Sequence, residues 1–341
     1  MRKINVLVTG IGGPTAQGIM RGLHEKNDIY IVGADRRTIS AGHYLCHHSY
    51  QIPRFTETEA YKQAIKDIVL KENIDVVFPA LHEEIEIYET FRQEIEAIVA
   101  LPQTNIIDVL QDKEKLYMHL ASHGLSQYLP TYYGFETSEE LRRIAEKNFS
   151  ESTYIVVKQV EGHGSLGFAI LTDRKHYLQA LKQAKPKVVN IEDYYDLHLC
   201  DRRIAMEYMK GSEFSVDVFL HNGQVAIAIP RERTGVSNGI VLDGYIVHNQ
   251  RLIQIASEIS PHLAVNGFLN LQFIATDEGY KLTDVNPRFC GSQVMSLGAG
   301  INFPYLFIQY HVLNERPIIE PIWNTRMIRY RDHFFVYEDE Q

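Results

Sequence analysis

Apolar and polar positions follow a regular alternation over the first third of the chain. Short apolar runs predict buried strands, and longer stretches with apolar residues three or four positions apart predict helices. The predicted strands cover residues 4–8, 29–34, 75–79 and 97–101, and the predicted helices cover residues 16–24, 61–71 and 83–91. Strands that alternate with helices indicate a mostly parallel, doubly wound α/β sheet with right-handed crossovers.

A different pattern begins near Asp108, where strands are joined by hairpin signals. The predicted helices cover residues 112–123, 173–184, 252–263 and a stretch that starts at 302. A strand, a glycine-rich turn and a second strand are predicted over residues 154–172. Strands at 204–209, 215–220 and 225–230 are expected to share one antiparallel sheet, with a tight turn at residues 221–223. This part of the chain is therefore predicted to be α+β.

Three polar residues alternate at the end of an apolar run in the segment 281–288. Asp284, Asn286 and Arg288 would point to one face of a strand. A hairpin turn at Gly279 would bring Gln272 beside Asp284. Carboxylate and amide oxygens suit Mg²⁺, and an Arg fork suits phosphate. The alternative is a half-buried hairpin with solvated polar residues.

Two glycine-rich loops are candidates for binding phosphate. The loop at residues 162–167 follows Lys158, whose position at the end of a β-branched run predicts a partly buried base. The alternative is a plain hairpin with a surface lysine. The loop at residues 9–18 follows the first strand and, with Asp35, imitates a dinucleotide fingerprint. A tight strand-to-helix turn explains that loop at least as well.

Two further polar segments have weaker signals. Glu207 and Glu213 flank a bend where a carboxylate could accept both ribose hydroxyls, although in isolation this is a charged hairpin. Residues 230–239 predict a loop with Arg231 and Arg233, which suits carboxylate or phosphate recognition or is simply solvated. His43, Cys46, His47 and His48 fit no standard zinc spacing, so we interpret them as structural.

Composition limits the class of protein. The chain has 341 residues, a net charge of −9, 45% hydrophobic and 23% charged residues. This is ordinary for a globular protein and argues against general binding of nucleic acid or anionic membranes. The three cysteines are too few for a disulfide framework, and the first apolar run is too short for a signal peptide. A cytoplasmic location is therefore expected, with no membrane span.

The order of these motifs resembles the ATP-grasp superfamily, specifically the carboxylate–amine ligases similar to the carbamoyl-phosphate-synthase large chain. The order comprises Lys113, then Lys158 with its glycine loop, the bend at 207–213, Gln272, and Asp284-x-Asn286-x-Arg288. The resemblance covers nearly the whole chain. It implies a Rossmann-like domain at 1–108, an ATP-grasp small lobe at 109–205, and a large lobe with the metal-binding strand at 206–341.

The resemblance also implies a role for each matched residue. Lys113 and Lys158 would contact ATP phosphates, with Lys158 and Arg288 as catalytic groups. The adenine and ribose contacts would come from Glu207, Met209 and Glu213. The phosphate flap would include His163, Gly164 and Ser165, and Mg²⁺ would be held by Gln272, Asp284 and Asn286. Gly12, Glu83, Arg231 and Arg233 are the candidates for contacting substrate.

The metal positions of this sequence differ from the family's usual residues. The family usually has Glu where this chain has Asp284 and often has Glu where it has Gln272, although Gln272 matches the carbamoyl-phosphate-synthase pattern. Only one of these ligands is anionic, which weakens the case for a second metal ion. In this family the N-terminal sheet domain does not carry the nucleotide, so the loop at 9–18 is reassigned to the substrate pocket.

The implied function is an ATP-dependent ligase that joins a small carboxylate to an amine, or to a thiol, through an acyl phosphate. ATP and Mg²⁺, with Mn²⁺ as a substitute, would be the cofactors, and a homodimer is one assembly that the resemblance suggests. Two alternatives remain. One is an NAD-dependent oxidoreductase that uses the N-terminal glycine loop, and the other is a non-catalytic ATP-binding regulator.

Overall fold

The computed structural model describes residues 2–162, 167–237, 240–330 and 333–336. The chain forms two compact units, each assembled from separate stretches. The first contains residues 1–107, 215–271 and 286–341, and the second contains residues 108–214 and 272–285. The division into consecutive domains at 1–108, 109–205 and 206–341 stays a prediction, since the two compact units interleave along the chain.

The N-terminal part of the first unit is a five-stranded parallel sheet with strand order β3-β2-β1-β4-β5. Its strands are β1 (Ile4–Thr9), β2 (Ile29–Asp35), β3 (His48–Gln51), β4 (Val76–Phe78) and β5 (Ile98–Val99). The sequence pattern predicted four of these strands and missed β3. The missed strand is a partly exposed edge strand rich in polar residues, so it lacks the apolar run that marks the others.

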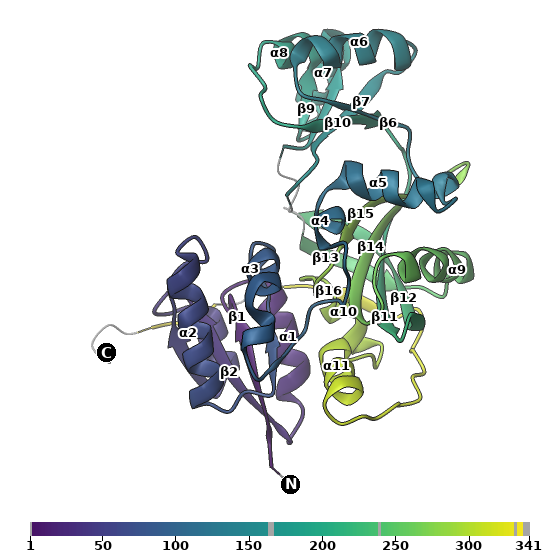
Figure 1. Ribbon diagram of the computed structural model, residues 1–341. Coiled ribbons are helices and arrows are strands. Elements are labelled where there is room, and N and C mark those ends of the chain that lie inside the picture. The colour runs from purple at the N-terminus through teal and green to yellow at the C-terminus, as the bar shows by residue number, and fades with distance from the viewer. Residues whose placement is uncertain (1, 163–166, 238–239, 331–332, 337–341) are drawn as a thin grey trace. The chain divides into compact units, whose positions relative to one another are not determined.

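Helices cover both faces of this sheet, as the doubly wound prediction requires (Figure 1). They are α1 (Pro14–His24), α2 (Thr58–Lys71) and α3 (Glu84–Phe91). Alternate residues of β1 belong to different cores: Val6 and Val8 pack with α1, whereas Leu7 packs with α2 and α3. This two-sided burial explains why the strand is a continuous apolar run. The predicted fold class is confirmed.

The second unit contains a five-stranded sheet with order β6-β10-β7-β8-β9. Its strands are β6 (Tyr132–Phe135), β7 (Tyr154–Gln159), β8 (Ala169–Thr172), β9 (Val188–Asn190) and β10 (Arg203–Glu207). Its helices are α4 (Ile107–Gln111, which starts one residue before the boundary), α5 (Lys113–Ser122), α6 (Ser138–Asn148), α7 (Arg174–Lys182) and α8 (Ile191–Tyr195). Asp112 caps α5, and Asp173 caps α7 as the sequence predicted.

A six-stranded sheet has the order β15-β14-β11-β12-β13-β16. Its strands are β11 (Glu213–His221), β12 (Gln224–Ser237), β13 (Ile240–Ile246), β14 (Gly267–Thr276), β15 (Gly279–Asn286) and β16 (Arg326–Ile328). The helices α9 (Gln250–Ile259), α10 (Val294–Gly298) and α11 (Phe303–His311) belong to the first unit. The described residues also include 3₁₀ turns at Ala41–Leu45, Arg92–Glu94, Ser126–Tyr128 and Ser260–His262.

Two predictions about these strands are wrong. The strand at 204–209 does not share a sheet with β11 and β12, because β10 pairs with β6 and β7 instead. The segment 230–239 is not a loop up to Ser237, because β12 continues through Arg231 and Arg233 and pairs with β13. Its polar residues do not break the strand, since a bulge near Gly235 absorbs the irregularity.

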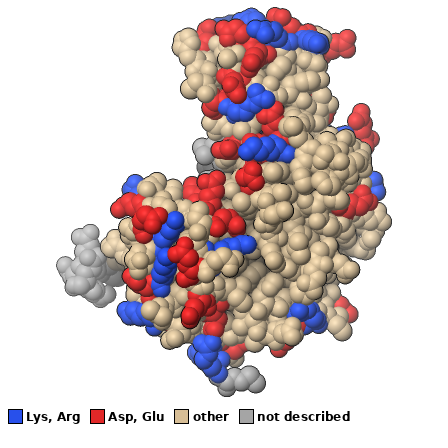
Figure 2. All heavy atoms as spheres, viewed as in Figure 1, with Lys and Arg blue, Asp and Glu red and all other residues tan. Residues whose placement is uncertain are grey.

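Charge is mixed on the face drawn in Figure 2. Acidic and basic side chains of the described residues are interspersed there. Among the residues that the structure describes, no helix is long and apolar enough to cross a membrane.

Candidate active site

Lys158 lies on β7 and is half-buried in the second unit. The pKa of its ammonium is lowered from 10.5 to about 8, chiefly by burial. The carboxylate of Asp284 opposes this shift, the positive charge of Lys113 adds to it, and the carboxylate of Glu213 opposes it. The amine is therefore held in a site that disfavours its own charge, a state typical of functional lysines. An incoming anion would relieve this penalty.

Lys113 is the first residue of α5, and it is more deeply buried than Lys158. Its backbone N–H donates to Val160 O at 2.9 Å, and its Nζ donates to Gly162 O at 3.2 Å. Its Nζ also lies 3.9 Å from Asp284 Oδ1. These contacts join Lys113 to the start of the glycine-rich loop that follows β7, and its role in binding phosphate stays a prediction.

Asp284 faces these two lysines from β15. Its carboxylate is partly exposed, and its Oδ1 accepts a hydrogen bond from Val285 N at 3.1 Å. The β14–β15 hairpin is confirmed, and Thr283 Oγ1 donates to Gln272 O at 3.3 Å across it. Tyr117 of α5 donates its buried hydroxyl to Thr283 O at 3.0 Å. This bond holds Lys113's helix beside the strand that carries Asp284.

Only the borders of the predicted phosphate flap are among the described residues. His163, Gly164 and Ser165 lie outside the described residues. At its borders, Gly162 and Gly167 have φ values of +104° and +61°. A Cβ on Gly167 would lie 2.6 Å from Gln159 Cγ. Glycine is therefore required at Gly167 for both backbone and steric reasons.

The bend predicted to bind adenosine connects β10 to β11. Glu207 is the last residue of β10, and its N–H donates to Thr131 O at 3.0 Å while its Oε1 accepts from Thr131 N at 2.7 Å. This N–H is already used, so only other main-chain groups of the bend could serve adenine. Glu213 begins β11, and Met209 lies between the two strands. The roles of all three in binding nucleotide stay predictions.

The residues predicted to hold Mg²⁺ are compatible with one ion. Asp284 supplies the one anionic oxygen donor, and Gln272 and Asn286 supply neutral oxygens. No group of three His, Cys, Asp or Glu side chains in the described part of the chain could hold a metal by itself. A carboxylate already close to Lys113 is a weak ligand alone. These donor types suit a divalent ion that also takes oxygens from a nucleotide, and the role of the three residues as metal ligands stays a prediction.

Strand alternation accounts for only part of the Asp284-x-Asn286-x-Arg288 motif. β15 ends at Asn286, so the period of two does not extend to Arg288. Arg288 Nη1 instead donates to Phe289 O at 2.8 Å in the following bend. Its contact with a transferring phosphoryl group stays a prediction.

The structure contradicts a substrate role for the side chain of Arg231. This residue is fully buried, and its Nη2 donates to Asp217 Oδ1 at 2.7 Å while its Nη1 donates to Ser292 O at 2.8 Å. Asp217 is also buried and accepts from Asn270 and Ser296. A guanidinium enclosed in this way is a structural cation. Arg233 is half-buried on the same strand, and its predicted role is untested.

Polar groups at the N-terminal glycine loop already form hydrogen bonds with other residues of the protein. Gly12 N donates to Asp35 Oδ2 at 2.9 Å, and Arg37 Nε donates to Asp35 Oδ1 at 2.9 Å. Burial alone would raise the pKa of Asp35, but these hydrogen bonds hold it below its ordinary value. The Arg37 guanidinium also fills the space where a Cβ on Gly12 would lie. The acid that would bind ribose in a dinucleotide enzyme is thus already paired.

Sequence reasoning missed Glu84, the neighbour of the predicted substrate residue Glu83. The carboxylate of Glu84 is buried and accepts hydrogen bonds from the Thr9 and Tyr61 hydroxyls at 2.6 and 2.7 Å. It also accepts from the N–H groups of Ala80 and Leu81, both at 3.1 Å. Burial raises its pKa despite these bonds. Glu84 thereby joins the carboxyl ends of β1 and β4. The two adjacent glutamates at the helix start were the available signal.

Two family models match separate parts of the chain. One, described as "ATP-grasp in the biosynthetic pathway with Ter operon", matches residues 200–331, and one described as "PylC-like, N-terminal domain" matches residues 6–101. The first match places residues 200–331 in the ATP-grasp superfamily. This confirms the assignment made from the order of the motifs.

A curated relative of this chain is the arginine-specific large chain of carbamoyl phosphate synthase from Halalkalibacterium halodurans. It is 26% identical over 273 residues, which cover 76% of this chain. The match covers 24% of the relative, so this chain spans about a quarter of that protein's length.

Solved structures share the fold. The L-amino acid ligase from Bacillus licheniformis superposes with a TM-score of 0.64 at 16% identity, over 91% of this chain and 74% of that one. The biotin carboxylase domain of Hydrogenobacter thermophilus 2-oxoglutarate carboxylase gives 0.66 at 15%, over 91% and 70%. That structure is a dimer in complex with ADP, its magnesium salt and bicarbonate. At these identities the likeness establishes the fold.

Proposed function

We propose that this ATP-grasp protein is an ATP-dependent ligase that joins a small-molecule carboxylate to an amine. The observation that supports this most is the group formed by Lys113, Lys158 and Asp284. It places two ammonium groups and one hard carboxylate around the start of a glycine-rich loop. The relatives point the same way, because they include an L-amino acid ligase and a carbamoyl phosphate synthase chain.

The proposed reaction has two steps. A carboxylate oxygen of the substrate attacks the γ-phosphorus of ATP, the bond to the β–γ bridging oxygen breaks, and ADP leaves with that electron pair. The amine then attacks the acyl carbon, the bond from this carbon to the phosphate oxygen breaks, and phosphate departs. The amine proton passes to solvent. Neither step needs a protein nucleophile, so charge neutralisation and positioning dominate.

The chain's own residues supply this neutralisation. Lys158 and Lys113 would contact the phosphate chain and offset its negative charge, and Arg288 would stabilise the transferring phosphoryl group. Gln272, Asp284 and Asn286 would hold Mg²⁺ or Mn²⁺, which supplies further charge neutralisation on the phosphate oxygens when bound. Cys290 is buried against Arg231 and Asp217, consistent with a packing role.

The alternatives have less support. An NAD-dependent oxidoreductase would need the Asp35 carboxylate for ribose, and this carboxylate is paired with Arg37 and Gly12. A non-catalytic nucleotide-binding regulator is favoured by one observation, the single anionic ligand in the metal set. A thioester-forming ligase or a carboxylate kinase would share the first step, so products separate them.

The test is ADP release in the presence of Mg²⁺ with pools of amino acids, small acids and amines. We expect ADP formation that depends on both an acid and an acceptor, with a new C–N bond detected by mass spectrometry. Asp284→Ala should abolish turnover. Asp277→Ala, at the exposed turn of the same hairpin, is the matched control and should not.

Each negative result has a distinct meaning. ADP formation that ignores every added acid and amine would contradict the ligase proposal. Nucleotide binding without any turnover would favour the regulator. Full activity of Asp284→Ala would remove the metal role from this residue.

A further inference from the structure

The first compact unit contains a cleft outside the candidate nucleotide site. One cavity of about 330 Å³ is lined by the β5 region and by the start of β14, with Phe307 and His311 of α11. A second cavity of about 450 Å³ continues along residues 103–106 and 261–265. Arg92 and Gln103 line both, so the two cavities form one divided cleft. None of its described lining residues belongs to the candidate nucleotide or metal set.

A bridge of three hydrogen bonds divides the cleft. Gln103 N donates to Asn266 O at 2.8 Å, Val265 N donates to Gln103 O at 2.9 Å, and Asn266 Nδ2 donates to Gln103 Oε1 at 2.7 Å. Gly267 packs so closely behind this bridge that an added Cβ would lie 2.9 Å from Pro102 Cα. The walls of the cleft are therefore held by backbone pairing and close packing, which makes it a preformed cavity.

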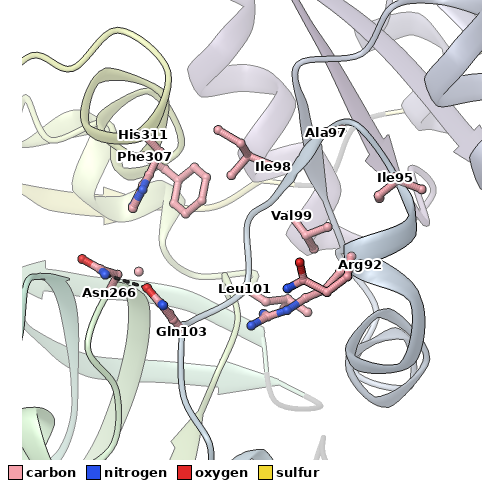
Figure 3. Close-up of a pocket in the computed structure, with 12 residues that line it drawn as sticks. Arg92, Ile95, Ala97, Ile98, Val99, Leu101, Gln103, Asn266, Phe307 and His311 are labelled. Atoms are coloured by element: carbon pink, nitrogen blue, oxygen red, sulfur yellow. Dashed lines mark hydrogen bonds between the residues drawn. The ribbon is translucent and has the colours of Figure 1, made fainter.

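The lining has one polar end and one apolar side (Figure 3). The Arg92 side chain extends toward Gln103, and the Phe307 ring faces the β5 region that carries Ile98. Arg92 is mostly buried, and its ion-pair partner among the described residues is Glu89, at 2.9 Å. Glu89 contacts Nη1, and a guanidinium has five N–H donors, so Arg92 can also donate to a second carboxylate. A dianion would place more negative charge beside Glu89, so the polar end suits a group with a single negative charge.

His311 is another polar residue in the lining of the first cavity. Its Nε2 is buried and has no hydrogen-bond partner in the described structure. Burial lowers the pKa of His311 to about 4, with a further contribution from the nearby His221 and Arg316, so the imidazole is neutral at pH 7. A neutral imidazole in the lining can donate or accept one hydrogen bond, so His311 adds a polar position to the cleft without adding charge.

We propose that this cleft is a binding site for a small monocarboxylate with an apolar or aromatic body. The carboxylate would bind Arg92 and the Gln103 amide, and the body would lie against Phe307 and Ile98. A cavity of this size holds a small organic molecule. A phosphate ester is disfavoured because its second charge would lie close to the Glu89 carboxylate, and a neutral apolar ligand would make no charge-assisted hydrogen bond with the guanidinium.

The experiment uses the whole chain, without ATP, so that binding is measured independently of any ligase activity. Saturation-transfer NMR and calorimetry are recorded with phenylacetate and hexanoate at millimolar concentration, with phenylacetamide as the uncharged match. Both acids are expected to bind, and phenylacetamide at least about tenfold more weakly, because it lacks the charge-assisted bond to Arg92. A crystal soaked with 4-iodophenylacetate should show iodine next to Phe307.

Three variants separate this site from others. Arg92→Gln should weaken phenylacetate about tenfold or more. The double variant E89Q/R92Q should do the same without leaving an unpaired carboxylate, so lost binding cannot be ascribed to a strained Glu89. Arg142→Gln removes a surface arginine paired with Glu192 on the other unit and should bind like the parent.

Several results would overturn the proposal. These are no binding of either acid by the parent chain, equal binding of phenylacetate and phenylacetamide, or affinity unchanged in E89Q/R92Q. Iodine found only outside the cleft would also overturn it. None of these results bears on ADP formation, so this proposal and the ligase proposal can fail separately.

Discussion

Replacing Lys158 by methionine should stabilise the protein while abolishing nucleotide binding. The ammonium is held with its pKa lowered from 10.5 to about 8, chiefly by burial. A shift of this size corresponds to about 3 kcal/mol that opposes folding with the lysine charged. Solvent reaches part of the side chain, so we expect Lys158→Met to raise the free energy of unfolding by about 1–2 kcal/mol near pH 7.

The stability difference between Lys158→Met and the parent should change with pH in one direction. Below pH 8 the folded parent carries the full penalty of the charged amine. Between pH 8 and 10.5 its folded state loses the proton before the unfolded state does, so the parent gains stability as pH rises. The advantage of Lys158→Met should therefore shrink across this window. Denaturant unfolding of the ATP-free protein near pH 7 and again near pH 10 measures it.

The matched control is Lys175→Met, at an exposed position of α7. It should change stability by less than about 0.5 kcal/mol and leave nucleotide binding intact. Loss of stability in Lys158→Met at pH 7, or an advantage that grows with pH, would refute the reasoning. Nucleotide binding by Lys158→Met that equals the parent's would show that the buried ammonium does not face phosphate.

Three further predictions rest on other parts of the structure. Asp284→Glu, which restores the family's usual residue, should lower the Mg²⁺ concentration needed for nucleotide binding a few-fold. Calorimetry at varied Mg²⁺ measures this concentration, and an unchanged midpoint of the Mg²⁺ titration would contradict the prediction. Asp217→Asn breaks the buried pair with Arg231 and should destabilise by about 3–5 kcal/mol, whereas Asp243→Asn, at a surface pair, should change stability by less than about 1 kcal/mol. Equal effects in thermal unfolding would contradict that difference. Glu84→Ala leaves four buried donors and should destabilise by roughly 2–4 kcal/mol, with Glu84→Gln intermediate; a neutral Glu84→Ala would show that the carboxylate does not hold β1 and β4 together.

Parts of the fold were predictable because local patterns match buried geometry. The sheet is buried on both faces, and this burial produces the apolar runs of β1, β2 and β4. The apolar spacing of α1 and α2 reflects the same packing. The edge strand β3 was not predictable, because an edge strand needs no continuous apolar run.

The polar residues of β11 and β12 show where pattern reasoning fails. Arg231 was predicted to lie in a loop and to contact substrate or be solvated, because arginine rarely occurs in a core. Asp217 lies within an otherwise apolar strand, and this was the unused signal that a buried partner exists. Pairing between strands decided the outcome, since a charge is tolerated in a core only when a partner from another segment neutralises it.

The sequence by itself determined the superfamily and the residue types of the site. The order of two lysines, a glycine-rich loop and a hairpin of oxygen ligands is readable without coordinates, since phosphate chemistry restricts which side chains can serve. Only the tertiary structure decided which charges are available. It gathered Lys113, Lys158 and Asp284, lowered the pKa of Lys158, and enclosed Arg231 with Asp217. Burial and distance control the energy of a charge, and both arise from contacts between segments far apart in the chain.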